Sequence, residues 1–191
     1  MECTKGQDQE ATSLPCLNSN ISTETETQTP STLAKLSTQH RKSAFILKES
    51  VQHLADKYPL ENLGFLTLTF AQHTICPKEA QRRLNSLITH VVKPRYHEYL
   101  GVFERMKSGR IHYHLLVVLD CDIRTGMDFK EVKNRNYSSA NLNLRKEWAF
   151  LRFTVKKYGF GRTELLPVKS NIEAMAKYVG KYIAKLPRSR K

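Results

Sequence analysis

The sequence predicts an α+β fold in which helices pack on the faces of an antiparallel sheet. Segments with apolar residues at helical spacing alternate with short strand-like runs, in the order β-α-β-β-α-β-α after a leading helix. Two of the strands are close enough in sequence to form a hairpin, which makes that part of the sheet antiparallel. With 191 residues, 40% of them hydrophobic, the chain can build one domain with its own core. This order is a split βαβ pattern.

The first part of the chain differs in composition from the rest. Residues 1–38 are rich in Ser, Thr, Gln and Glu, and this composition cannot bury enough apolar surface to offset the entropy of ordering. We therefore expect a disordered polar tail over 1–38 and a folded domain over 39–191.

The first half of the folded region contains two helices and a strand. From Arg41 to Tyr58 apolar residues recur at helical spacing, and Pro59 ends that helix. In the strand 65–70, threonines alternate with apolar residues. A second helix is expected over about 77–92, because its apolar residues again repeat every three to four positions.

The second half begins with a hairpin at about 96–119 and a loop at 121–139. A helix is expected over about 142–158, and two glycines then turn the chain into a short strand at 162–168. The last helix begins at a capping box whose N-cap is Ser170, and it ends before Pro187.

The charge of the chain points to a polyanionic partner. The net charge is +13, and it is unevenly distributed, because residues 1–32 carry −4 and the remainder +17. Ribosome-like and non-specific basic proteins share such a charge, so it does not identify the partner.

The four cysteines are far apart and form no Cys-x-x-Cys pair, which favours free thiols in a reducing cytosol and argues against a zinc site. The chain has no signal-peptide pattern and no run of 18 apolar residues, so neither secretion nor membrane insertion is expected.

The run Arg110 to Leu119 contains two histidines one residue apart. Because side chains alternate along a strand, His112 and His114 point to one face, and Tyr113 points to the other. Two imidazoles on one face can bind a single divalent ion. A lone His-x-His also occurs as polar residues on a half-exposed strand, so the pair needs further support.

Glu104 joins this pair if the hairpin loop has three residues, Lys107 to Gly109. Met106 then pairs with Arg110, and Glu104 falls opposite His112 on the same face. A register error of one residue would place Glu104 on the other face. Two imidazoles and one carboxylate leave open positions on a six-coordinate ion, which suits Mg²⁺ or Mn²⁺ in contact with a phosphate.

The last helix carries two phenols and two ammonium groups on one face. Spacings of three and four residues align them; they are Tyr178, Lys181, Tyr182 and Lys185. A phenol can attack phosphorus, and a lysine can stabilise the charge on the phosphate oxygens. Alternatively, the tyrosines pack and the lysines form a solvated edge.

Together, Glu104, the His-Tyr-His run and the tyrosine helix resemble the HUH endonucleases, the initiators of rolling-circle DNA replication. The resemblance covers about residues 60–186 and is closest to the two-tyrosine initiators of small single-stranded-DNA phages and related plasmid and prophage proteins. It implies an RRM-like, or ferredoxin-like, antiparallel core with the histidine strand central. The strand 65–70 takes the place of the first motif strand of the family.

The resemblance also implies the chemistry. His112, His114 and Glu104 would hold Mg²⁺ or Mn²⁺, and Tyr178 or Tyr182, with Lys181 beside the phosphate, would cleave one strand and remain linked to its 5′-phosphate. We favour Tyr178 for the first cleavage, because it precedes Lys181 by three residues as in single-tyrosine members.

The expected partner is single-stranded DNA at a replication origin. Candidate DNA contacts are basic side chains near the site and on the helix before the last strand: Lys185, Arg110, Arg152, Lys156 and Lys157. The printed chain stops soon after the tyrosine helix, so we expect a host helicase as a partner. The expected location is the cytoplasm of a bacterial host, with the protein encoded by a prophage or plasmid.

Two other classes remain open. A non-catalytic RRM-like module could bind single strands by base stacking and phosphate contacts, but it leaves the coincidence of acid, histidine pair and tyrosine pair unexplained. An HUH-type transposase is a closer rival. A conjugative relaxase is disfavoured, because relaxases place their tyrosines early in the chain.

Overall fold

The computed structural model describes residues 38–169, and all structural statements here concern that region. The expected polar tail, up to residue 37, lies outside it. So does the tyrosine helix, with Tyr178, Lys181, Tyr182 and Lys185. The domain boundary at 38/39 therefore stays a prediction.

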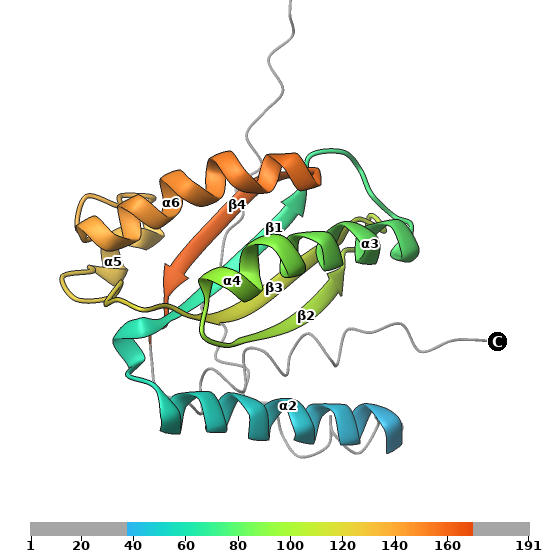
Figure 1. Cartoon of the computed structure of the whole chain (residues 1–191), viewed down its shortest axis with the longest axis horizontal. Coiled ribbons are helices and arrows are strands. Elements are labelled where there is room, and N and C mark those ends of the chain that lie inside the picture. The colour runs from blue at the N-terminus through green and yellow to red at the C-terminus, as the bar shows by residue number, and fades with distance from the viewer. Residues whose placement is uncertain (1–37, 170–191) are drawn as a thin grey trace, which may run out of the picture. The chain divides into compact units, whose positions relative to one another are not determined.

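The described region is built on one antiparallel sheet of four strands in the order β2-β3-β1-β4. The strands are β1 (Leu63–Phe70), β2 (Tyr99–Arg105), β3 (Ile111–Val118) and β4 (Phe160–Pro167). The histidine strand, β3, lies between β1 and β2, as expected. The sheet and its helices confirm the predicted α+β class (Figure 1).

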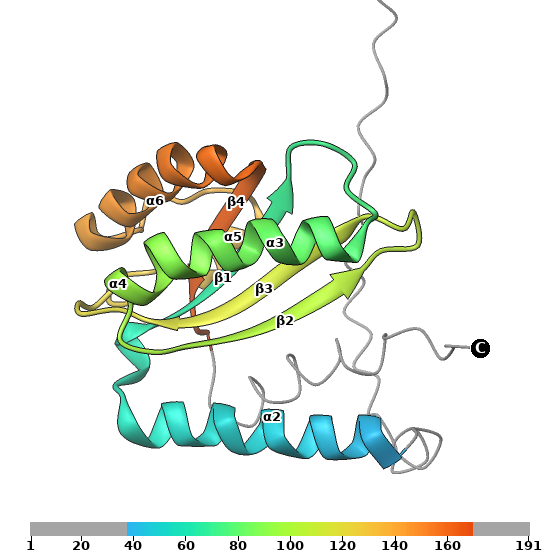
Figure 2. The ribbon, with the colours of Figure 1, turned by 45° about the vertical axis from the view of Figure 1, so that its right-hand side comes forward.

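Two helical segments cover one face of the sheet. The first comprises α3 (Pro77–Leu87), η2 (Ile88–Val92) and α4 (Lys93–Arg95), and the second comprises α6 (Leu142–Thr154) and η3 (Val155–Tyr158). Figures 1 and 2 show α3 and α6 side by side on this face. The main core lies beneath them and includes buried residues of β1, β3 and both helices: Leu66, Leu68, Tyr113, Leu115, Leu84 and Leu144.

Helix α2 (Thr38–Lys57) packs on the opposite face of the sheet (Figure 2). Its buried side chains Leu47, Val51 and Leu54 form a second cluster with Leu116 and Val118 of β3. The apolar residues beyond the histidines thus pack under α2, as expected for a central strand. The same face of β3 changes from apolar at this end to imidazole at the other, and that change defines where the polar site can form.

The structure corrects the predicted loop at 121–139, which contains a short helix, α5 (Phe129–Lys133). Asp128 caps it, because its side chain accepts hydrogen bonds from the backbone N–H groups of Lys130 at 2.8 Å and Glu131 at 3.4 Å. A five-residue helix is too short for apolar periodicity to reveal it. The aspartate cap was the available signal.

Two strands also start earlier than expected. The first strand begins at Leu63 instead of Phe65, after a short 3₁₀ turn, η1 (Leu60–Asn62). The last strand begins at Phe160, directly after Gly159, whose φ of 83° ends η3. Glycine reaches this left-handed conformation at little cost, so the turn needs no further residue.

Candidate active site on the histidine strand

The β2–β3 hairpin brings Glu104 to the histidines. Its loop has the predicted form: the Met106 N–H donates to the Arg110 carbonyl at 2.9 Å, and Gly109, with φ 82°, donates its N–H to the Met106 carbonyl at 2.8 Å. Glu104 consequently pairs with His112 in the register of the sheet. The predicted register is confirmed, and the three side chains share one face.

Glu104 contacts the second histidine. Its Oε2 lies 3.1 Å from His114 Nε2, which is a diagonal contact, because Val102 is the residue directly opposite His114. Both side chains are shielded, with His114 7% and Glu104 14% exposed. His114 also stacks on Phe65, with ring centroids 5.5 Å apart. The carboxylate and this imidazole are thus fixed relative to each other.

The other side of the imidazoles is held by two threonines of β1. Thr67 pairs with His114 and Thr69 with His112, and in each pair the threonine Oγ1 lies 3.2 Å from the histidine Nδ1. Each hydroxyl therefore contacts one ring nitrogen and leaves Nε2 as the other. Hydrogen bonds of this kind orient histidines that bind metal ions.

Sequence reasoning identified the alternation of Thr67 and Thr69 along their strand but gave them no function. The hairpin register follows from a local turn, whereas pairing of β1 with β3 joins residues more than forty positions apart. The missed signal was the combination of a Thr-x-Thr strand and a His-x-His strand, whose polar faces match when the strands pair.

The threonine hydroxyls allow both tautomers of the histidines. When His114 Nε2 carries the proton and donates it to Glu104, Nδ1 accepts a hydrogen bond from the Thr67 hydroxyl. When Nε2 is a ligand, Nδ1 carries the proton and the hydroxyl accepts it. A hydroxyl can take either role, so the same contact suits both states.

Burial also favours the ligand form of His112. Desolvation lowers the pKa of this imidazole below its ordinary value, and the neighbouring charges of Arg110 and His114 lower it further, while Glu104 raises it. A neutral imidazole is the form that binds divalent ions. The environment of His112 therefore lessens competition from protons.

The donor set fits Mg²⁺ or Mn²⁺ in chemistry. Adjacent ligands of an octahedral ion with bonds of about 2.1 Å are about 3.0 Å apart, close to the 3.1 Å between His114 Nε2 and Glu104 Oε2. Within residues 38–169, no three His, Cys, Asp or Glu side chains are grouped so as to hold an ion. The fit thus consists of suitable donors and two adjacent donor atoms, and His112 must adjust to complete the set.

The predicted DNA contacts separate into two groups. Arg110 donates to the carbonyl of Phe70, and its buried Nε has no partner among the described residues, so this side chain links the hairpin to β1. Arg152 lies over the ring of Trp148 on α6, 5.9 Å from the centroid. Lys156 and Lys157 are exposed on η3, where they line a groove with two arginines that sequence reasoning did not select.

Comparison with known proteins gives the family. The model of the replication-associated protein family of the ORF2 type matches residues 64–187. The chain belongs to this family. The match includes all three candidate metal ligands and the two tyrosines, and it confirms the relationship to rolling-circle Rep-type initiators that the motif order predicted.

A curated relative supports the same conclusion. The family member is 58% identical over 177 residues to the phasyl DNA replicon protein arp of Escherichia coli. The aligned region covers 90% of this chain and 62% of the relative, so the chain spans less than two thirds of that protein's length. No solved structure matches the chain. Among the described helices, none has the length and apolar character needed to cross a membrane.

Proposed function

We propose that this family member initiates rolling-circle DNA replication by nicking and rejoining single-stranded DNA through a 5′-phosphotyrosine intermediate. The observation that carries the proposal is the meeting of Glu104 and His114, at 3.1 Å, on the sheet face that also carries His112. Membership in the replication-associated family supplies the substrate class.

In this proposal Glu104, His112 and His114 hold Mg²⁺ or Mn²⁺. The ion would polarise the scissile phosphate and fix its orientation. Thr67 and Thr69 keep the imidazole rings in place, and the burial of His114 excludes water from one side of the site.

The chemical step belongs to the tyrosine helix, which lies outside the described residues. The Tyr178 oxygen forms a bond to phosphorus while the bond between phosphorus and the 3′-oxygen breaks. The phenol loses its proton to solvent, and the leaving oxygen takes up a proton to give a 3′-hydroxyl. Lys181 stabilises the negative charge on the phosphate oxygens. Tyr182 then provides a second nucleophile for the joining of strands.

The proposal includes single-stranded DNA at an origin as substrate, a host helicase as partner and the cytoplasm of a bacterial cell as location. A phage, plasmid or transposon source fits the same residues equally well.

A covalent-adduct assay tests the chemistry. The protein is incubated with single-stranded oligonucleotides and Mn²⁺, and a protein–DNA band is sought on a denaturing gel. His112→Ala and His114→Ala should lose the adduct but keep DNA binding, which is mostly electrostatic. The exposed His90, on η2, provides a matched His90→Ala control that should keep full activity. Full activity in EDTA would refute the metal ligands.

The nucleophile is assigned by two further variants. Tyr178→Phe should lose the adduct, and Tyr182→Phe should keep the first nick but impair repeated strand transfer. An adduct that persists in Tyr178→Phe and disappears in Tyr182→Phe would reverse the order. Binding without any adduct in the wild-type protein would favour a non-catalytic single-strand-binding module.

A further inference from the structure

A basic groove of about 450 Å³ lies between α3 and η3, on the helix-covered side of the sheet. We call it the α3–η3 groove. Four cationic side chains line it: Arg82, Arg83, Lys156 and Lys157. They come from segments about seventy residues apart in sequence, so the fold assembles this concentration of charge. The chemistry of the candidate active site uses none of them.

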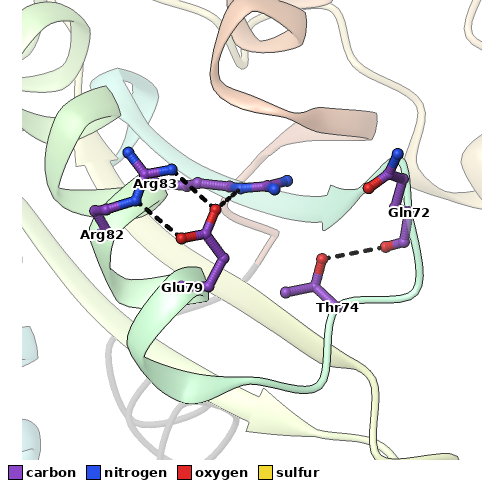
Figure 3. A network of polar contacts seen from close by, with 5 residues as sticks. All are labelled: Gln72, Thr74, Glu79, Arg82 and Arg83. Carbon is purple, nitrogen blue, oxygen red and sulfur yellow. Dashed lines mark hydrogen bonds and ion pairs between the residues drawn. The ribbon is translucent and has the colours of Figure 1, made fainter.

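The two arginines are held in position by one carboxylate. Glu79 accepts two hydrogen bonds from Arg82, both at 2.9 Å, and one from Arg83 Nε at 2.6 Å (Figure 3). These contacts lower the pKa of Glu79 to about 2, so it is ionised at neutral pH. One carboxylate against four cations leaves the groove with a net positive charge. Because two of the cations are already oriented, a ligand has fewer side chains to order.

Gly159 lets Arg83 lie flat along the groove. A Cβ at this position would lie 2.6 Å from Arg83 Nη1, and the φ of 83° also disfavours any other residue. Within the described part of the chain, the terminal nitrogens of Arg83 have no hydrogen-bond acceptor. A planar guanidinium with two such nitrogens suits a phosphate, which can accept both.

An exposed aromatic ring adjoins the groove. Phe153 of α6 has 70% of its surface exposed, and Lys157 Nζ lies 5.2 Å from its ring centroid. Tyr158, which is half-buried, also lines the groove. Cationic side chains beside exposed rings are typical of surfaces that bind single-stranded nucleic acid, because phosphates contact the cations and unpaired bases stack on the rings.

The groove lies near the candidate active site along β1. Gln72 lines the groove, and it follows Thr69, the partner of His112, by three residues. Three residues of extended chain span about 10 Å. A single DNA strand bound at the histidines can therefore reach the groove by passing the C-terminal end of β1. A groove at the far end of the sheet would not allow this.

We propose that the α3–η3 groove binds the backbone of single-stranded DNA next to the nicking site, with Lys156, Lys157 and the two arginines on phosphates and Phe153 stacked on a base. This inference rests on the proposed function for its substrate. It adds a binding surface that is separate from the metal ligands and the tyrosines.

Salt-dependent binding without catalysis tests the charge. Binding of fluorescein-labelled oligothymidylate to the full chain in EDTA is followed by anisotropy over a series of salt concentrations. For single strands the slope of log affinity against log salt is about −0.7 per phosphate contact, so Lys156→Gln/Lys157→Gln should make the slope less steep by roughly 1.4. At about 0.1 M salt the affinity should fall roughly 25-fold.

The matched control removes the same charge elsewhere. Lys130→Gln/Lys133→Gln alters two exposed lysines of α5, near the start of α6 and about 20 Å of helix from η3 (Figure 1). This variant should keep a slope close to that of the wild type. Equal losses in the two double variants would mean general electrostatic attraction and would overturn the proposal.

A second variant tests the strand type. Phe153→Ala should weaken binding of the single strand by at least about fivefold, because stacking on the ring is lost, and should leave the salt slope unchanged. Affinity for a duplex of the same sequence should not change, since its bases are already stacked. Leu142→Ala, at a residue 65% exposed on the same helix, is the apolar control. Wild-type binding by both the lysine and the Phe153 variants would overturn the proposal.

Failure of this inference is distinguishable from failure of the proposed function. If the protein nicks DNA and both groove variants bind like the wild type, the groove is excluded and the chemistry stands. If the groove variants bind weakly but no adduct ever forms, the groove is supported and the nicking mechanism fails.

Discussion

The contact between Thr67 and His114 offers the sharpest test of the site, because the structure assigns the threonine a function that the sequence did not. Thr67→Val keeps the size and the β-branched shape of the side chain and removes the hydroxyl that lies 3.2 Å from Nδ1. The change therefore acts on one hydrogen bond and leaves the strand propensity intact.

The magnitude follows from burial. His114 is only 6% exposed, so water cannot readily replace the lost hydroxyl, and a buried polar atom without its partner costs about 1–3 kcal/mol. For a chain of this size each kcal/mol shifts Tm by roughly 2–4 °C. His112 is half-buried, so Thr69→Val should cost less, about 1 kcal/mol or below. Both variants should weaken Mn²⁺ binding about 10–100-fold, as expected when a ligand loses its orienting partner.

Two measurements separate these effects. Thermal unfolding in EDTA gives the stability, and calorimetric titration with Mn²⁺ gives the affinity. Thr163→Val on β4 is the matched control: its hydroxyl is buried without a partner among the described residues, so its loss should be neutral or stabilising. Wild-type affinity for Mn²⁺ in both Thr67→Val and Thr69→Val would refute the orienting function. Equal loss of stability in Thr67→Val and Thr163→Val would refute the contribution of the hydrogen bond.

Two stability predictions concern the framework of the site. Gly109→Ala forces a side chain into a φ of 82°, so it should cost about 1–2 kcal/mol in denaturant unfolding; an unchanged midpoint would show that the loop adopts another turn. Glu147→Gln breaks a buried pair in which Arg95 donates from Nε at 2.8 Å and also from Nη2, and Tyr96 donates at 2.6 Å. It should cost about 3 kcal/mol, the low end for such pairs, because 38% of the Arg95 side chain is exposed; a loss below about 1 kcal/mol in the same assay would show that this pair is not important for stability.

Much of the fold followed from the sequence because its signals are local. The order of elements, the hairpin register and the central position of β3 depend on apolar periodicity, a three-residue loop and a strand that is apolar on both faces. These features need only neighbouring residues to be recognised. The short helix α5 and the early start of β1 were missed because each is shorter than the stretch over which a periodic pattern can be recognised.

The missing parts of the site are those that depend on pairing across long sequence separations. Glu104 and His112 are eight residues apart and joined by one turn, so their pairing was predictable. Thr67 meets His114 only through the β1–β3 register, and Arg83 meets Lys157 only through packing of α3 against η3. No local pattern encodes either contact, because register and helix packing are decided by the whole core.

The core and the site are consequently determined together. On β1, Leu66 and Leu68 point into the main core, while Thr67 and Thr69 point to the histidines. A shift of one residue between β1 and β3 would exchange these faces, placing hydroxyls in the core and leucines at the imidazoles. Burial of the leucines therefore holds the threonines in register with the histidines. The same strand then leads through Ala71 and Gln72 into the α3–η3 groove, so one β-strand both orients the proposed metal ligands and leads into the proposed path of the DNA.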